Sequence, residues 1–123
     1  MIKTITIGDK EVTFKSSAAI PHIYRRTFGR DVFVDMDHMQ RSLKPKKDGT
    51  AEMSAESLDM LESLAWCFAK HADPAVPDDP EQWLEQFEMM DIYAVFPEVI
   101  SMWSGENKST SKLKKNPEKL TER

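Results

Sequence analysis

Few side chains in this sequence are suited to nucleophilic or metal chemistry: one cysteine, Cys67, and three histidines, His22, His38 and His71. Cys67 lies in the apolar run LAWCF, and a cysteine acts as a nucleophile only where its surroundings lower the pKa of its thiol. We therefore expect a buried, unreactive thiol. The histidines lack the His-x-x-x-His spacing that places two zinc ligands on one face of a helix, so no zinc site is predicted.

The grouping that most resembles a metal site is Asp35, Asp37 and His38. Residues two apart on a helix point in different directions, so a solvated acidic face is the favoured interpretation. His71 is interpreted as a histidine near the negative C-terminal pole of a helix. With four glycines in all, the sequence also lacks the glycine-rich loop that cradles phosphate. We therefore assign no catalytic, cofactor-binding or metal-binding residue, and we expect that the protein is not an enzyme.

The elements that must position these residues begin with a β-hairpin in residues 1–15. Apolar and polar residues alternate in IKTITI and EVTFK, and Gly8-Asp9-Lys10 between them supplies the turn. A two-stranded hairpin is only marginally stable alone, so we expect it to pack on helices.

Helices are predicted for most of the remaining chain, because apolar residues recur three or four positions apart and caps or breakers mark several ends. The segment 54–72 has the clearest apolar stripe and is the predicted core helix. Loops are predicted at 44–50 and 73–79. The other helical segments are 18–28 (capped by Ser16 or Ser17 and ended by Gly29), 32–43 (capped by Asp31), one that starts at Asp79-Pro80 and includes Met90, and one capped by Asp91 that Pro97 either kinks or restarts near residue 96.

Composition limits the fold class. The 123 residues suffice for one domain, no apolar run approaches the roughly 20 residues that cross a bilayer, and one cysteine without an internal partner is typical of a reducing cytoplasm. Segment 104–123 has six basic and three acidic residues, so it carries +3 and the rest of the chain carries −7 of the net −4. We predict a mainly α (α+β) fold: a compact helical bundle with the hairpin over 1–103, and a Lys/Ser-rich disordered tail over 104–123.

The surplus of apolar residues favours a binding function. Trp66 falls on the far side of the stripe of helix 54–72, which indicates either a central helix covered on two sides or a second apolar face left for a partner. The chain also contains eight methionines, which are flexible and common on surfaces that accept varied apolar helices. The candidate partner-binding residues are Met60, Trp66, Met89, Met90, Met102 and Trp103.

Three segments carry a family resemblance when taken together: IKTITIGDKEVTFKSSAAIPHIYRRTFGRDV, LDMLESLAWCFAK and PEQWLEQFEMMDIYAVFPEVISMW. The most specific parts are the stretch from Pro21 to Asp31, and Asp91-Ile92-Tyr93 with Pro97 and Trp103. With the Ser/Lys-rich end, this pattern resembles the tail assembly chaperones of siphophages and prophages of Gram-positive bacteria. The resemblance covers essentially the whole chain.

The resemblance implies a non-enzymatic protein of the bacterial cytoplasm that is absent from the mature virion. Such chaperones bind the long, helix-rich tape measure protein, keep it soluble and help the tail tube protein assemble around it. The tape measure protein is therefore the expected partner, with the tail tube protein as a second. We also expect self-association, or arraying of several copies on the client, because repeated contacts along an extended chain give avidity. No membrane partner is expected.

An alternative interpretation is a small phage-encoded regulator that binds DNA or a host factor. Its recognition helix would hold Arg25, Arg26 and Arg30, although that segment is short and ends at Gly29. The lysines of segment 104–123 lack interleaved aromatic residues, and the rest of the chain is acidic, which disfavours a dedicated nucleic-acid binder. The sequence therefore favours the chaperone.

Overall fold

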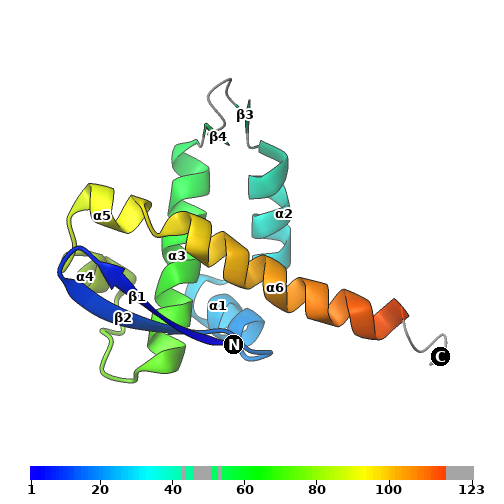
Figure 1. Cartoon of the computed structure of the whole chain (residues 1–123), viewed down its shortest axis with the longest axis horizontal. Coiled ribbons are helices and arrows are strands. Elements are labelled where there is room, and N and C mark those ends of the chain that lie inside the picture. Colours follow the sequence, from blue (N-terminus) through cyan, green and yellow to red (C-terminus); the bar gives the residue numbers. More distant parts are fainter. Residues whose placement is uncertain (43, 46–50, 53, 116–123) are drawn as a thin grey trace.

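The computed structural model of the chain describes residues 1–42, 44–45, 51–52 and 54–115 (Figure 1). It is mainly helical with an N-terminal β-hairpin, which confirms the expected fold class. Among the described residues, no helix combines the length and the apolar character needed to cross a membrane. The elements in chain order are β1 (Ile2–Ile7), β2 (Lys10–Lys15), α1 (Ile20–Phe28), α2 (Val32–Ser42), β3 (Lys44–Pro45), β4 (Ala51–Glu52), α3 (Ala55–Ala72), α4 (Pro80–Leu84), α5 (Met89–Tyr93) and α6 (Phe96–Lys115).

β1 and β2 form the predicted antiparallel hairpin. Ile7 pairs with Lys10, so a two-residue turn joins the strands, and Gly8 in this turn has a positive φ of 65°, which glycine adopts without a steric penalty. Ile7 and Phe14 are buried. The alternation in the sequence therefore places one face of the hairpin on the core.

α3 is the centre of the molecule. β2, α1, α2, α4 and α6 all pack against it, and Figure 1 shows it between the hairpin and α2. Leu61, Ala65 and Phe68 of the predicted stripe are buried, and so are Leu64 and Cys67 on other sides of the helix. Of the two interpretations of its apolar residues, the central helix covered on more than one side is confirmed.

Local capping signals predict the starts of α2, α3 and α4 correctly. The side chains of Asp31, Ser54 and Asp79 each accept a hydrogen bond from a backbone N–H two or three residues further along. The start of α1 differs: its N-cap is Ala19, which makes no side-chain cap bond. The Ser17 hydroxyl instead accepts from the N–H of Ala19 itself at 3.1 Å. The predicted serine cap of α1 is therefore wrong.

The chain after α3 forms three helices where the sequence predicts two. Glu88 is the N-cap of α5, so the predicted capping residue, Asp91, lies inside that helix. α6 starts at Phe96 with Pro97 as its second residue, where the missing N–H removes no helical hydrogen bond; the proline restarts a helix and does not kink one. α6 continues to Lys115, so the boundary predicted after Trp103 falls within a helix.

The connection between α2 and α3 contains a short antiparallel strand pair where the sequence predicts a loop. Lys44 of β3 pairs with Glu52 of β4, and Pro45 pairs with Ala51. Predictions for several positions lie outside the described residues, namely residue 43, residues 46–50, residue 53 and residues 116–123.

Candidate functional site

Four of the six predicted partner-binding residues lie in the hydrophobic core. They are Met60 (4% exposed), Trp66 (3%), Met102 (2%) and Trp103 (6%). Neighbouring helices cover them: the ring of Trp66 packs against Phe28 of α1 with centres 5.8 Å apart, and that of Trp103 packs against Phe33 of α2 at 5.2 Å. The prediction that these four residues form an open contact surface is therefore wrong.

Trp66 has a further structural role. Its indole Nε1 donates to the carbonyl oxygen of Pro77 at 2.9 Å, which satisfies the polar end of the buried ring. The bond holds the connector after α3 against the middle of that helix. Lys70 strengthens the same connection by donating to the carbonyl oxygens of Pro74 and Val76 at 2.9 and 2.6 Å.

Met89 and Met90 are the two predicted contact residues that do reach solvent. They are the first two residues of α5 and are 66% and 71% exposed. Ile92 of the same short helix is buried, so the inward side of α5 is already filled and the two methionines are left on its outer side. Adjacent exposed methionines are a flexible apolar contact surface.

The structure also exposes two apolar residues of α2 that the sequence analysis did not select. Phe33 and Val34 are 52% and 62% exposed, whereas Val32 and Met36 are buried. The sequence contained an indication of this exposure. Three consecutive apolar residues at the start of a helix point in different directions, so they cannot all face one core.

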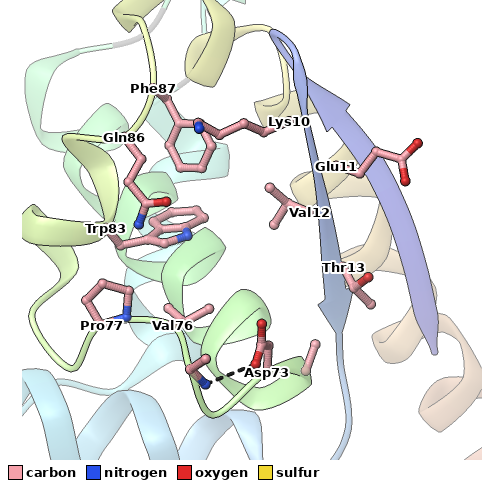
Figure 2. Close-up of a pocket in the computed structure, with 12 residues that line it drawn as sticks. Lys10, Glu11, Val12, Thr13, Asp73, Val76, Pro77, Trp83, Gln86 and Phe87 are labelled. Atoms are coloured by element: carbon pink, nitrogen blue, oxygen red, sulfur yellow. Dashed lines mark hydrogen bonds between the residues drawn. The ribbon is translucent and has the colours of Figure 1, made fainter.

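An open groove of about 440 Å³ lies between β2, the connector after α3 and α4 (Figure 2). Its apolar walls are provided by Val12, Val76, Trp83 and Phe87. The rings of Trp83 and Phe87 pack edge to face with centres 5.1 Å apart, and Figure 2 shows Gln86 extending beside them. A groove of this type is suited to receive an apolar side chain of a partner.

The surroundings of the groove are acidic. Its lining includes two carboxylates and a single lysine, Lys10. Residues 73–98 contain eight acidic residues and no lysine or arginine; residues 73–87 contribute seven lining residues, of which Asp73 is the acidic one. Of these eight, only Asp78 and Glu98 form an ion pair with a basic residue in the described part of the chain. The negative charge of this region is therefore largely unneutralised.

The most strongly bonded carboxylate lies elsewhere, at the contact of α1 with α2. Asp35 accepts hydrogen bonds from Arg30 Nε at 2.7 Å, from Arg30 Nη2 at 2.8 Å and from the Tyr24 hydroxyl at 2.7 Å. The Arg30 bonds hold the pKa of Asp35 below its ordinary value despite burial. Burial and then Asp35 raise the pKa of Tyr24. Because the Asp35 side chain is 6% exposed, the solvated-face interpretation is wrong for this residue.

The remaining members of the predicted acidic face have surface partners. Asp37 pairs with Arg41 through Oδ2 and Nε at 3.0 Å, and His38 lies against Glu56 of α3 with 3.1 Å between Nε2 and Oε1. Asp35 and Asp37 therefore point apart, as helix geometry predicts. Within residues 1–42 and 54–105, no three metal-ligating side chains come together.

Cys67 and His71 are also held in structural environments. Burial raises the pKa of the Cys67 thiol to about 12, so the thiol stays protonated at neutral pH. His71 Nε2 lies 2.8 Å from the Ser17 hydroxyl, and burial, followed by nearby positive charges, lowers the pKa of His71. The contact joins α3 to the segment before α1, 54 residues away in sequence, and no local pattern predicts it.

Comparison of the chain with protein-family models, curated proteins and solved structures finds no match. The surface features described above are the exposed Met89–Met90 pair, the exposed Phe33 and Val34, and the groove along β2.

Proposed function

We propose that this protein is a phage tail assembly chaperone that binds the tape measure protein, keeps it soluble and promotes assembly of the tail tube around it. The resemblance in sequence supports the proposal. The structural observation that carries it is the exposure of Met89 and Met90 at the start of α5. Two large apolar side chains exposed together within an acidic segment form a surface suited to an apolar partner.

The physical requirements of such a client match these features. A tape measure protein is a long helical chain whose apolar stripes must not aggregate before the tube encloses them. Unbranched methionine side chains adapt to stripes of different shape. The net charge of −7 outside segment 104–123 keeps a complex of client and chaperone in solution. Several copies along one client would bind with avidity even if each contact is weak.

We further propose that the protein acts by binding and not by catalysis. The environments of its reactive side chains support this. The Cys67 thiol has a raised pKa of about 12, and both oxygens of Asp35 are used in bonds to Arg30 and Tyr24. A nucleophile or a general base requires the opposite: an accessible group whose pKa lies near the working pH.

Co-expression with a tape measure fragment tests the proposal. The unaltered protein is expected to keep the fragment in the soluble fraction and to co-elute with it. The variant Met89→Lys/Met90→Lys loses about 3 kcal/mol of apolar contact by the area rule, which weakens binding roughly 100-fold, so the fragment should become insoluble.

The matched control for this experiment is Val34→Lys, which places a lysine at an apolar position of α2 that is 62% exposed. It should solubilise the fragment as the unaltered protein does. A fragment that stays insoluble with the unaltered protein and does not co-elute contradicts the proposal. Equal solubilisation by the double methionine variant would contradict the assignment of the surface.

The alternative of a DNA-binding regulator loses support at α1. Arg30, one of its three basic residues, is held by Asp35 in a two-bond ion pair. Arg25 and Arg26 remain exposed, but two arginines at the end of a nine-residue helix provide few of the phosphate contacts on which such binding depends. A salt-dependent mobility shift with duplex DNA would restore this alternative.

A further inference from the structure

The groove of Figure 2 follows the free edge of the hairpin. Four consecutive residues of β2, Lys10 to Thr13, line it, although their side chains alternate between the two faces of the strand. No residue of β1 lines it, because β1 pairs with the opposite edge of β2. An edge strand offers unpaired backbone N–H and C=O groups, and proteins commonly cover such edges with a helix or loop.

In the described part of the chain no backbone hydrogen bond from another element reaches Lys10 to Thr13 at this edge, and the chemistry of the groove indicates what would fit. Its apolar walls, Val76, Trp83 and Phe87, favour an occupant with a large apolar side chain. Two carboxylates line the groove, Glu11 and Asp73, against one lysine, Lys10. Residues 1–103 carry a net charge of −7, so the groove favours an occupant with positive charges.

The second half of α6 has this composition. Residues 104–115 contain four lysines (Lys108, Lys112, Lys114 and Lys115), a single acidic residue, Glu106, and one large apolar residue, Leu113. Figure 1 shows the C-terminal half of α6 projecting away from the other helices. By composition this segment, the arm, carries +3, and it extends to the opposite end of the molecule from α4 (Figure 1).

The arm cannot reach the groove of its own molecule. α6 begins at Phe96, on the side of α3 near α5 (Figure 1), and rises about 1.5 Å per residue, so Lys115 lies about 28 Å further along the axis. A straight helix cannot fold back on its own start. The partner that fits the groove is thus the same arm of another molecule.

We propose that the C-terminal half of α6 of one copy docks in the groove along β2 of a second copy. Such an interface is heterologous and does not close on itself by symmetry, so it would link copies head to tail. Met89 and Met90 do not line the groove and would stay accessible on every copy. The inference goes beyond the proposed function, because it concerns contact between copies and holds whatever the client is.

Two complementary variants of the full chain test the contact by analytical ultracentrifugation at low ionic strength. The arm variant is Lys112→Gln/Lys114→Gln/Lys115→Gln, and the groove variant is Gln86→Trp, in which an indole fills the groove from an exposed position. The unaltered protein should increase in average mass with concentration. Each variant alone should remain a monomer.

An equimolar mixture of the two variants is the decisive sample. The intact arm of the groove variant can dock in the intact groove of the arm variant, and no further copy can be added. The mixture should therefore give a species of twice the monomer mass, which should dissociate at about 1 M salt, where the Debye length falls to about 3 Å. Arg25→Gln/Arg26→Gln/Arg41→Gln is the control, because it removes three exposed positive charges outside the arm and should self-associate as the unaltered protein does.

Several results would overturn the inference. They are a monomeric unaltered protein at all concentrations, a mixture of the variants that stays monomeric, and self-association that persists in the arm variant. None of these bears on the client: Met89→Ser/Met90→Ser, which adds no charge, is expected to self-associate normally while failing to solubilise a tape measure fragment, so the two proposals fail separately.

Discussion

Single residues that hold the structure together include several that sequence patterns place on the surface. Asp35 is the main example. Its carboxylate accepts three hydrogen bonds, from Arg30 and from Tyr24, whose side chain is buried. Asp37, two positions along, has its only described ion pair with Arg41 on the exposed face. Two carboxylates that lie two positions apart in the same helix therefore contribute differently to the free energy of unfolding.

Replacing Asp35 by alanine is expected to lower the free energy of unfolding by about 2 kcal/mol, because the buried Tyr24 hydroxyl then lacks its acceptor. Arg30 contributes less to this loss, since its side chain is 55% exposed and stays hydrated. Asp37→Ala is the control and should cost under about 0.5 kcal/mol. Urea unfolding at neutral pH measures both, and equal losses in the two variants would contradict the prediction.

The same carboxylate has a predictable pH dependence. The pKa of Asp35 is lowered in the folded protein, chiefly by Arg30, and an unfolded aspartate titrates near about 3.9. The folded state therefore releases this proton more readily than the unfolded state, and its stabilisation is complete above about pH 4 and is lost as the pH falls through the lowered value. A plot of unfolding free energy against pH should be less steep in acid for Asp35→Ala than for the unaltered protein.

Among the secondary-structure elements, the hairpin turn and the end of α1 each contain a glycine with positive φ, which allows the chain to change direction there. Gly8 joins β1 to β2 at φ 65°, and Gly29 ends α1 at φ 67° while its N–H donates to the carbonyl oxygen of Arg25 at 2.8 Å. The two differ in their surroundings. A Cβ added at Gly8 would lie 2.7 Å from Oδ2 of Asp91 in α5, whereas one at Gly29 meets no atom within 4 Å. The turn of the hairpin is therefore also a packing contact with α5.

Gly29→Ala is expected to cost about 1 kcal/mol, the backbone penalty of a left-handed residue alone. Gly8→Ala should cost more, about 2 kcal/mol, because the added methyl also displaces Asp91. Thermal unfolding of both variants measures the difference. Shortening the obstructing side chain, in Gly8→Ala/Asp91→Ala, should remove most of the excess; if it does not, the close approach is not its cause.

At the scale of the whole molecule, burial and charge are distributed unevenly along the chain. Among the residues up to Gly105, whose burial the structure describes, the last buried hydrophobic residue is Trp103, and α6 continues to Lys115. The acidic residues 73–98 precede the basic residues 104–115. One end of the molecule is thus negative with an open groove, and the other is positive and projects from the body, which is the arrangement from which we infer head-to-tail contact.

A chain ending at Gly105 is expected to fold as the full chain does, because it retains every core residue that the structure describes, the last of which is Trp103. Its midpoint of thermal unfolding should lie within about 2 °C of that of the full chain, since 1 kcal/mol corresponds to about 4 °C or more at this size. The shortened chain should also be monomeric at low salt. A midpoint lowered by more than about 4 °C would show that residues 106–123 contribute to the stability of the domain.

Local sequence patterns predict the hairpin and the helices up to α3, together with several of their ends. The hairpin, the central helix and the caps at Asp31, Ser54 and Asp79 depend on residues within a few positions of each other, so alternation, periodicity and capping chemistry predict them. The cap of α1 and the start of α5 were predicted wrongly: the helices begin after Ala19 and Glu88, and the Ser17 hydroxyl lies against His71 of α3, 54 residues away in sequence. The exposed Met89–Met90 pair was anticipated only as part of a larger set of candidates.

The packing of separate elements determines which apolar side chains remain accessible. Trp66 and Met102 lie on helices that are apolar on several sides, and periodicity cannot indicate which of those sides another element covers. The Tyr24–Asp35–Arg30 network and the groove along β2 depend on the angles at which separate elements pack. Such contacts join residues that are distant in sequence, and their geometry is set by close packing of the whole core and not by any local pattern.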